Sequence, residues 1–543
     1  MVLPRSARTW TLVVFGVFAL AIVVAIWSLP GFLVQDSPLY LYNTHLIHEL
    51  LRSQSPFQEY FVLDGRPMPY WGAYALLGAL MTVLPPRVAD QVLMTLTSVG
   101  LATAVVWLRW RVAGWQGGAI VALLVIVLSV NVLWMYGIHN FLLGAILYVA
   151  TLAYWWRVRD RMGAGHAAVL ALLLLAGYFA HLMSFVPAAM GVGVLALLTP
   201  GDNFRTRFKW TALSLVPCVP LVLFYFGMMG AEGQGSPYWK GLTDMGSSAD
   251  WLKYLFMADF PSFQEYGMKS SGGPILDLLF FLPPPSRFAL IGLCLIAGGA
   301  FLHRSEEDRV FYRLHRGWTA LAAVLLVGGA LGPSDMGTAA GTMRERMLLL
   351  GFVALVPVLK VKTNLAFTRT GACLVAMAAI GQVILCWDYA LKSNRLVGEF
   401  MKVKPHVGTN QRVAAVVETW EWPYRTNPLI HAPSLLGIHT GNMIWNNHAP
   451  ALNFFPIKYR NAELRTLSSR VSDRRYYDDP FAPGHREAAL NAYVSLMERS
   501  HESIDFLVLI SPTPELFEHS GQWFEPAPVY ESTRMKVLRH RSN

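Results

Sequence analysis

The sequence predicts a polytopic α-helical membrane protein that ends in a water-soluble domain of mixed α/β structure. Hydrophobic residues make up 54% of the 543 positions and charged residues 14%, and the mean hydropathy is +0.40. These values lie outside the range of ordinary soluble domains. Apolar windows of about 20 residues, long enough to cross a bilayer core, recur from Trp10 to Tyr389. We therefore expect a membrane domain over residues 1–391 and an extracytoplasmic soluble domain over 392–543.

The charge and cysteine patterns agree with a membrane protein. The net charge is +10, but the Lys and Arg residues gather in short loops between apolar windows, where membrane topology explains them better than a nucleic-acid partner does. The four cysteines lie inside apolar segments without a CxxC motif, so neither a disulfide framework nor a zinc site is expected. Window 10–29 is too long for a secretory signal and lacks a small-x-small cleavage site, so we expect a retained anchor.

About eleven spans are expected from the apolar windows. They cover residues 10–29, 88–108, 117–135, 138–156, 166–183, 184–199, 210–229, 286–302, 317–332, 346–360 and 371–389. The pair at 166–199 is short for two crossings, and one long helix kinked at Pro187 is the alternative. Window 69–84 is also short and is bounded by prolines. We expect it to lie in the interface or to re-enter, and not to span.

The basic clusters decide the orientation of these spans. If 69–84 does not span, all the clusters fall on the side of Arg5 and Arg8, as the positive-inside rule requires. The clusters are Arg109/Arg111, Arg157/Arg159/Arg161, Arg205/Arg207/Lys209, Arg304/Arg309/Arg313/Arg316 and Lys360/Lys362/Arg369. The opposite, non-cytoplasmic face then carries the first loop (30–87), a large loop (230–285) and the whole tail.

The first external loop places a carboxylate beside a predicted helix. Ser37-Pro38 is typical of a helix start, and apolar residues recur at helical spacing from Leu39 to Leu50. We expect an amphipathic helix over 38–52 that lies along the bilayer surface. Asp36 precedes this helix, where the helix dipole keeps a carboxylate ionised. The alternative is that Asp36 is only the first polar residue after a membrane helix.

Three stretches carry a family resemblance. The first loop contains D-x-P-x-Y at 36–40 and P-x-P-Y-W-x-A-Y-x-L-L-G at 67–78, and MRERMLLL follows at 343–350. Together with the single long anchor and the appended tail, these stretches resemble the GT-C superfamily of integral-membrane glycosyltransferases. The resemblance is one of layout over the whole chain, and it does not extend to one particular family within the superfamily.

This resemblance implies an inverting transfer of a sugar from a polyprenyl-phosphate donor to a glycan, lipid or protein acceptor on the extracytoplasmic face of a bacterial-type inner (plasma) membrane. Asp36 would be the general base that accepts the proton of the attacking hydroxyl. Arg346, and with it Arg344, would bind the phosphate of the leaving lipid. The alternative for the two arginines is that they snorkel to the interface with Glu345 as a local partner.

Further polar residues are candidates for substrate binding. They are His45, His48, Asp64, Arg66, His139, Asn140 and His181. For the first two, an interfacial histidine without a function is the alternative, and Asp64 and Arg66 either reach the sugar hydroxyls or order the loop by pairing with each other. The last three lie at membrane depth, where polar groups are costly, and turn capping or interhelical hydrogen bonds are the alternatives.

The remaining polar features are less specific. Loop 230–285 mixes acids with Tyr and Trp, which suits sugar stacking but also an aromatic belt at the interface. Asp478-Asp479 is typical of a solvated turn. One external carboxylate plus Asp64 is too little for a metal site, so we assign no cofactor and leave a divalent cation open. The sequence has no HExxH, GxxxxGK[ST] or GxSxG motif, which argues against zinc hydrolases, P-loop NTPases and serine hydrolases.

The tail contains strand-like runs at Val413–Val417, Phe506–Ile510 and Met535–Leu538 and a helical stretch near 486–497, so we expect a small mixed α/β domain there. Its position suits acceptor binding or a lid over the site. Two other functions stay open. A transporter or flippase of lipid-linked intermediates predicts charges buried in midspan, and a non-catalytic membrane scaffold predicts that Asp36→Asn leaves function intact.

Overall fold

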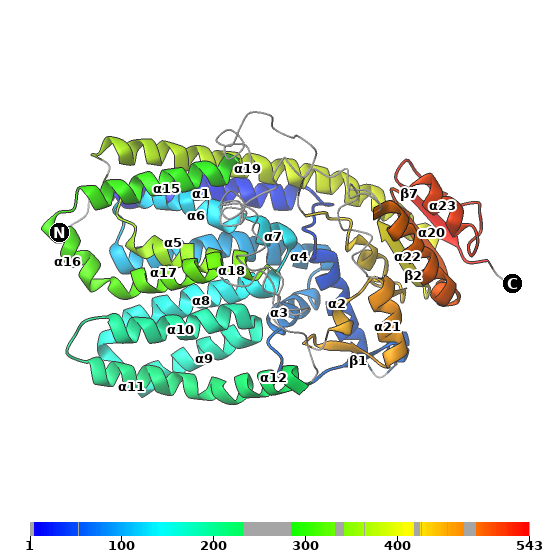
Figure 1. The fold of residues 1–543 in the computed structure, drawn as a ribbon, viewed down its shortest axis with the longest axis horizontal. Helices are drawn as coiled ribbons and strands as arrows, with labels where there is room; N and C mark the ends of the chain where they lie inside the picture. The colour runs from blue at the N-terminus through cyan, green and yellow to red at the C-terminus, as the bar shows by residue number, and fades with distance from the viewer. Residues whose placement is uncertain are drawn as a thin grey trace.

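The computed structural model shows a long bundle of helices with a smaller part of strands and helices at one end (Figure 1). It describes residues 5–52, 54–231, 284–331, 342–362, 364–417, 424, 426–452, 454–471 and 485–541. The predicted loop 230–285 lies almost wholly outside the described residues, as do Asp478-Asp479 and most of the segment that precedes Met343.

The bundle consists of helices that follow the predicted apolar windows, except for α16, which lies between windows 286–302 and 317–332. They are α1 (Arg5–Ser28), α4 (Pro86–Thr95), α5 (Leu101–Ala113), α6 (Gly118–Ser129), α7 (Val132–Tyr136), α8 (His139–Val158), α9 (Ala164–Ala180), α10 (Leu182–Leu198), α11 (Phe204–Leu215), α12 (Val219–Ala231), α15 (Pro284–Leu302), α16 (Glu306–Leu314), α17 (Arg316–Leu331), α18 (Met343–Leu355) and α19 (Ala366–Phe400). Among the described residues, 6 spans are long and apolar enough to cross a bilayer, or 7 if the bent pair α15–α16 counts as one. The full number of about eleven stays a prediction.

The chain breaks at His181, between α9 and α10. This residue is extended, with φ −168° and ψ 130°, whereas Pro187 lies inside α10 without ending it. Both helices pack against α8. Two short helices therefore occupy 164–198, and the alternative of one long helix kinked at Pro187 is wrong.

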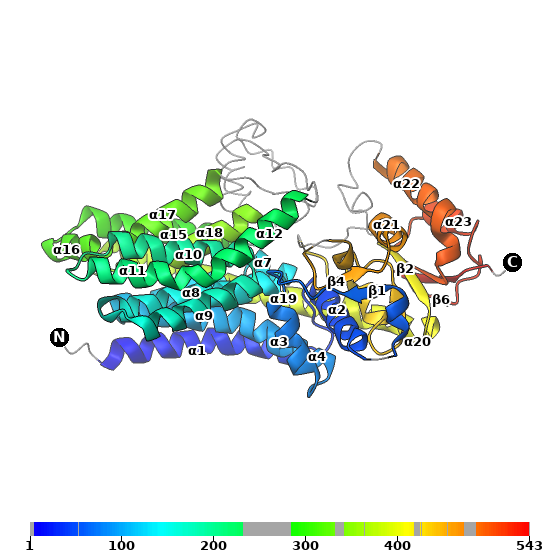
Figure 2. The ribbon, with the colours of Figure 1, turned by 90° about the horizontal axis from the view of Figure 1, so that it is seen from below.

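The basic loops gather at the end of the bundle that holds the N-terminus, opposite the C-terminal part (Figure 2). There, Nη2 of Arg109 donates to the Leu359 carbonyl at 3.4 Å, and Nε of Arg316 donates to the Leu198 carbonyl at 2.7 Å. These contacts tie together loops from distant parts of the sequence. The arrangement agrees with the one-sided charge distribution expected from the sequence.

Helix α3 (Gly72–Met81) does not cross the bundle. It has 10 residues, which at about 1.5 Å per residue is too short to span a bilayer. The helices that flank the first loop meet at one end, since Nε2 of Gln91 donates to the Ile26 carbonyl at 2.9 Å and Nε of Arg87 donates to the Pro30 carbonyl at 2.7 Å. The chain between α1 and α4 therefore leaves and returns at the same end, as expected for window 69–84.

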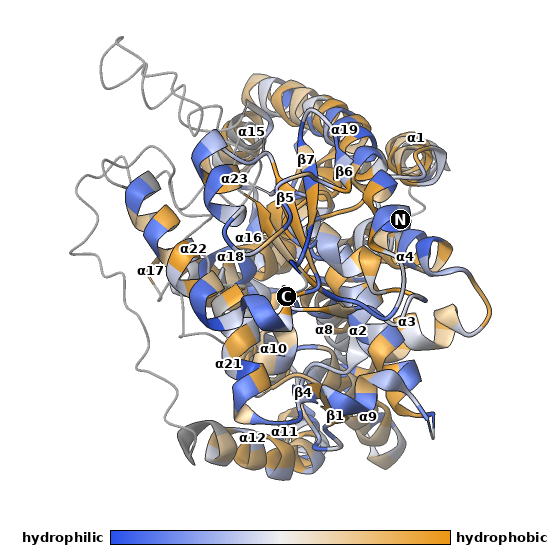
Figure 3. Ribbon diagram, turned by 90° about the vertical axis from the view of Figure 1, so that its right-hand side faces the viewer, coloured by the Kyte–Doolittle hydropathy of each residue, from blue (hydrophilic) through white to orange (hydrophobic). Residues whose placement is uncertain are grey.

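The C-terminal part is built on a five-stranded sheet with the strand order β3-β2-β5-β7-β6. The strands are β2 (Arg412–Val417), β3 (Met443–Ile444), β5 (Phe506–Ile510), β6 (Tyr530–Glu531) and β7 (Met535–Arg539), and the helices are α20 (Lys404–Val407), α21 (Ala462–Val471), α22 (His485–Ser500) and α23 (Pro514–Ser520). Strand β2 pairs in parallel with β3 and β5, and β7 is antiparallel to β5 and β6. Strand β5 is buried along its whole length and shows as a hydrophobic strand at the centre of this end (Figure 3).

The first loop is part of the same unit as the tail. Its strand β1 (Phe61–Leu63) pairs antiparallel with β4 (Ile457–Tyr459), and helix α2 (Ser37–Leu50) packs between α3 and the turn at Ala432–Leu436. Residues 37–47 of α2 are all buried. The expectation that the polar side of this helix is exposed is therefore wrong for residues 37–47, because the C-terminal part covers it. The position of the helix along the bilayer surface stays a prediction.

Helix α19 connects the bundle to the C-terminal part. It has 35 residues and runs from Ala366 to Phe400, past the domain boundary expected near residue 391. One hydrophobic core includes residues of both parts, from Ile22 in α1 to Leu538 in β7. The proposed division at 391 thus falls inside a continuous helix, and the two parts share their packing.

Candidate functional site

Asp36 stands at the N-terminus of α2 with its main chain bonded on both sides. Its N–H donates to the Tyr136 carbonyl at 2.9 Å, and its carbonyl accepts from the Tyr40 N–H at 3.0 Å. The carboxylate does not cap its own helix. Instead, Oδ1 lies 3.4 Å from Nε2 of Gln35 and 3.5 Å from Nε2 of His431 in the C-terminal part.

Gly137 allows the close approach that places Asp36. It follows α7 with φ +77°, a conformation that residues with a Cβ rarely adopt. A Cβ at this position would lie 2.8 Å from Cγ2 of Val34 and 3.1 Å from the backbone nitrogen of Asp36. The glycine therefore permits both the turn into α8 and the main-chain bond that holds Asp36.

Arg346 lies in the first turn of α18 and is 6% exposed. Its Nη1 is 3.1 Å from Nε2 of His181, and its guanidinium carbon is 5.4 Å from the ring centre of Phe141. The Tyr70 hydroxyl lies 2.9 Å from the same Nε2 and is also hydrogen-bonded to Arg346. Helices α8, α10 and α18 and the segment before α3 thus converge on one guanidinium.

The hydrogen bonds of His181 leave Arg346 without an anionic partner. Nδ1 of His181 accepts from the Met183 N–H at 3.0 Å, so a neutral ring carries its proton on Nε2 and donates to the Tyr70 oxygen. Nη1 of Arg346 faces a ring nitrogen that is already a donor, and its Nε has no hydrogen-bond partner. Within the described part of the chain, Arg346 contacts no carboxylate. A buried guanidinium in this state is suited to binding an anion.

The Tyr40 phenol is influenced by the charges of both Asp36 and Arg346. Burial holds the pKa of its phenol well above the ordinary value, the Asn140 N–H and the Arg346 guanidinium lower it, and the Asp36 carboxylate raises it further. Both charges therefore lie within electrostatic range of one ring, which also stacks on Tyr74 at 5.0 Å. Asp36 and Arg346, although distant in sequence, share one side of the bundle beneath the C-terminal part.

A solved structure resembles the chain over nearly its whole length. It is ArnT from Cupriavidus metallidurans bound to undecaprenyl phosphate, which overlays with a TM-score of 0.50 at 12% sequence identity and covers 98% of each chain. The chain has the GT-C fold. Two structures that overlay less closely are AftD from Mycobacteria (TM-score 0.48, 15% identity, 99% of this chain and 40% of that one) and AglB from Archaeoglobus fulgidus in complex with an inhibitory peptide and a dolichol-phosphate (TM-score 0.47, 11% identity, 93% and 70%). No protein-family model and no curated protein matches the sequence.

Within the GT-C fold, His139 and Asn140 hold other elements in place. Oδ1 of Asn140 accepts from the Ala73 N–H at 2.7 Å and its Nδ2 donates to the Tyr70 carbonyl at 3.1 Å, so it fixes the start of α3. His139 lies 3.3 Å from the Ser37 hydroxyl and is wholly buried. Both side chains are bonded to other parts of the protein, and their role as substrate contacts stays a prediction.

The other first-loop candidates pair within the protein. His45 is buried against the C-terminal part, where its Nε2 accepts from the His439 N–H at 3.3 Å, and His48 lies against Gly78 of α3. Asp64 forms a two-pronged pair with Arg66, with contacts of 2.8 to 3.2 Å, and its Oδ2 is 3.3 Å from Nζ of Lys458. The geometry of Asp64 and Arg66 favours the loop-ordering alternative. Arg344 is also buried and lies two residues before Arg346, in the same helical turn.

Three residues at the site carry no prediction of their own. Tyr40 and Tyr70 lie inside the two first-loop motifs, so the motifs could have pointed to them. His431 lies in the tail without a recognisable pattern, and only the folded chain brings it to Asp36.

The described residues contain no group of three or more His, Cys, Asp or Glu side chains placed to hold a metal ion.

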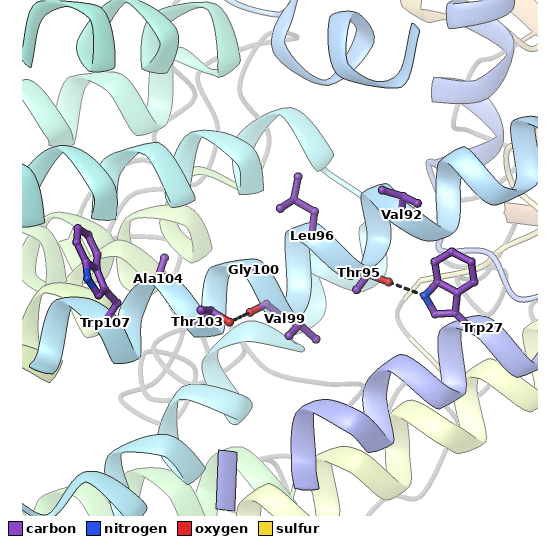
Figure 4. A pocket seen from close by; sticks show the side chains of 9 residues that line it. All are labelled: Trp27, Val92, Thr95, Leu96, Val99, Gly100, Thr103, Ala104 and Trp107. Atoms are coloured by element: carbon purple, nitrogen blue, oxygen red, sulfur yellow. Dashed lines mark hydrogen bonds between the residues drawn. The ribbon is translucent and has the colours of Figure 1, made fainter. Parts of the chain in front are cut away.

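A separate apolar groove of about 640 Å³ runs between α1 and the span formed by α4 and α5 (Figure 4). Its wall includes the π-helical turn Leu96–Gly100. Trp27 closes one end by donating from Nε1 to the Thr95 hydroxyl at 3.0 Å. None of the candidate site residues lines this groove, which belongs to the surface of two spans.

Proposed function

We propose that the chain is a membrane glycosyltransferase that moves a sugar from a polyprenyl-phosphate donor to an acceptor hydroxyl. The observation that carries the proposal is the buried guanidinium of Arg346, which faces His181 and Tyr70 and has no described carboxylate partner. The GT-C fold supports it, since the ArnT structure with this fold holds undecaprenyl phosphate.

Arg346 is proposed to bind the donor phosphate. As the bond between the sugar and the phosphate breaks, negative charge grows on the phosphate, and a fixed guanidinium stabilises that charge more than the ground state. The position of Arg346 in the first turn of α18 adds the positive end of a helix dipole. Arg344 in the same turn adds a second cation to this region.

Asp36 is proposed to act as the general base. The acceptor oxygen attacks the anomeric carbon, its proton passes to the Asp36 carboxylate, and the bond from the anomeric carbon to the phosphate oxygen breaks with its electron pair going to the phosphate. A single displacement of this kind inverts the anomeric centre. Asp36 stands at the N-terminus of α2, and its carboxylate accepts this proton once the acceptor hydroxyl lies within hydrogen-bond reach.

The site is proposed to open on the extracytoplasmic face of an inner membrane. The basic loops gather at the opposite end of the bundle (Figure 2), as the positive-inside rule requires for the cytoplasmic side. The C-terminal part would then be extracytoplasmic and would lie over the site, next to Asp36 through His431. The acceptor is a glycan, a lipid or a protein.

The proposal is tested by following a radiolabelled sugar carried on polyprenyl phosphate in vesicles that contain the purified protein and membrane extract as a source of acceptor. We expect the label to leave the polyprenyl phosphate and to appear on an acceptor, with free polyprenyl phosphate as the second product. Movement of intact donor across the vesicle membrane without cleavage would instead identify a transporter and would refute the proposal.

A further inference from the structure

A chain of buried hydrogen bonds joins the start of α2 to α4 and α8. The Ser37 hydroxyl donates to Oδ1 of Asp90 at 2.7 Å, and Oδ2 of Asp90 pairs with Nη1 of Arg87 at 2.9 Å. Nε2 of His139 lies 3.3 Å from the Ser37 oxygen. Because the single hydroxyl proton of Ser37 is engaged with Asp90, His139 is the donor in this contact. Ser37, Asp90 and His139 are each 0% exposed.

Arg87 extends this chain to the end of α1. Its Nε donates to the Pro30 carbonyl at 2.7 Å and its Nη2 to the Leu29 carbonyl at 3.3 Å. One chain of hydrogen bonds therefore joins the ends of α1, α2, α4 and α8, and within it the Asp90 carboxylate bonds Ser37 and Arg87. No other described carboxylate lies so deep on this side of the bundle with both oxygens bonded.

The free energy needed to bury the Asp90 carboxylate indicates that its main effect is to hold neighbouring residues in position, and not to stabilise the fold. Burying a carboxylate costs several kcal/mol, about as much as its ion pair recovers, and apolar replacements of such pairs are often neutral or stabilising. The hydrogen bond to the Asp90 carboxylate fixes the direction of the Ser37 side chain. Ser37 is the residue directly after Asp36 and the first residue of α2.

Other restraints hold the main chain of Asp36 and, through Gln35 and His431, its Oδ1. Its N–H is held by the Tyr136 carbonyl and its carbonyl by the Tyr40 N–H. The side-chain bond from Ser37 to Asp90 adds a tie between α4 and the residue next to Asp36, and it fixes the direction in which α2 starts.

We propose that Asp90 is a positioning residue for Asp36, acting through Ser37. This inference rests on the proposed function of Asp36 as the general base. Loss of the Asp90 acceptor lets the first turn of α2 shift, and a catalytic group misplaced by about 1 Å can lose about 100-fold in rate. The effect falls on the chemical step and leaves donor binding at Arg346 intact.

The test compares Asp90→Leu and Asp90→Asn in the purified full chain, with kcat and KM measured for sugar transfer from polyprenyl phosphate. The matched control is Asp308→Asn, which removes another buried carboxylate, 3% exposed and paired with Lys360 and Lys362 at the opposite end. We expect Asp90→Leu to lower kcat about 100-fold at unchanged KM. Asp90→Asn keeps an oxygen for Ser37 and should lose less, and Asp308→Asn should keep the wild-type kcat.

A double variant distinguishes a positioning role of Asp90 from a general loss of protein structure. When Asp36→Asn is already present, Asp90→Leu should cause no further fall in the residual rate, because residues that act as a unit are not additive. Additive losses, an unchanged kcat, or a rise in KM alone would overturn the inference. If Asp90→Leu does not fold, Ser37→Ala removes the same hydrogen bond but keeps the ion pair between Asp90 and Arg87, and its kcat decides the question. Full turnover by Asp36→Asn would refute the proposed function and this inference with it, whereas an unchanged kcat in Asp90→Leu beside an inactive Asp36→Asn would overturn the inference alone.

Discussion

Nη1 of Arg346 lies 3.1 Å from Nε2 of His181, although 165 positions separate the two residues in sequence. The contact brings the first turn of α18 to the break between α9 and α10. Because the Nε2 proton of His181 is directed at the Tyr70 oxygen, the histidine offers no lone pair to Nη1 of Arg346 and does not neutralise the guanidinium. This pair is the place where we propose that the donor phosphate binds.

Arg346→Lys is expected to lower kcat/KM for the polyprenyl-phosphate sugar, although it keeps the positive charge. Lysine keeps the charge but loses the planar fork that binds a phosphate in two places, and Arg346→Ala should lower kcat/KM for the polyprenyl-phosphate sugar about 100- to 1,000-fold. The matched control is Arg109→Lys, because Arg109 is also buried but donates to backbone carbonyls at the opposite end. Equal losses in the two lysine variants would show that burial, and not phosphate binding, explains the effect.

Tyr70→Phe is expected to reduce donor affinity about tenfold, equivalent to about 1.4 kcal/mol. The variant removes the oxygen to which both His181 and Arg346 are bonded, so the guanidinium loses its fixed direction. Titration with undecaprenyl phosphate measures the change. Tyr148→Phe is the control, since that buried hydroxyl makes only a 3.5 Å contact with the Leu350 carbonyl. An unchanged affinity in Tyr70→Phe would contradict the role given to this hydroxyl.

Gly137→Ala should damage both folding and catalysis, whereas Gly408→Ala should damage folding alone. Both glycines have positive φ, +77° and +76°, but a Cβ on Gly408 meets nothing within 4 Å. Each alanine strains the backbone by about 1 to 2 kcal/mol. Only at Gly137 does the new Cβ press on the main chain of Asp36. Thermal unfolding and kcat measured together check this, and a normal kcat in folded Gly137→Ala would be inconsistent with our account of how Asp36 is placed.

His45 is expected to make the protein less stable in mild acid. Burial, and then the neighbouring His439, lowers the pKa of His45 from 6.5 to about 4, and Arg52, His48 and Lys404 act in the same direction. Above pH 6.5 the residue is neutral in both folded and unfolded chains. Between pH 6.5 and 4 the unfolded chain takes up a proton that the folded chain refuses, so stability falls as the pH falls.

The change His45→Gln removes this titration. Thermal unfolding midpoints at pH 7.5 and pH 5 should therefore differ less in the variant than in the wild type, and the values at pH 7.5 provide the internal reference. A pH dependence that is the same in both proteins would show that His45 is not buried against the C-terminal part as the structure has it.

Much of the bundle could be predicted because hydropathy acts along the chain. Helices α1 and α19 follow apolar windows, and Asp36, His181 and Arg346 could be singled out because each is a polar group at the edge of such a window. The contact between His181 and Arg346 could not be predicted, since it depends on how α10 packs beside α18. Pairing between distant helices leaves no signal in a single sequence.

Helix α2 shows where local patterns misled. Its helical spacing was readable, but its polar residues predicted a solvent-facing side. In the structure, Oδ1 of Asn43 accepts from Nδ2 of Asn447 at 2.7 Å, and the Tyr42 hydroxyl donates to the Asn442 carbonyl at 3.0 Å. The polar side is thus matched to polar groups of the tail. A polar face that another part of the chain will cover looks the same in sequence as one that faces water.

In the proposed mechanism, Asp36 accepts a proton and Arg346 binds the donor phosphate, and one paired measurement tests these separate roles. Binding of undecaprenyl phosphate and turnover of the labelled donor are measured on the same samples of wild type, Asp36→Asn and Arg346→Ala. We predict that Asp36→Asn binds the lipid phosphate as tightly as wild type but transfers sugar about 100- to 10,000-fold more slowly, and that Arg346→Ala loses binding. Full turnover by Asp36→Asn, or wild-type binding by Arg346→Ala, would contradict the account.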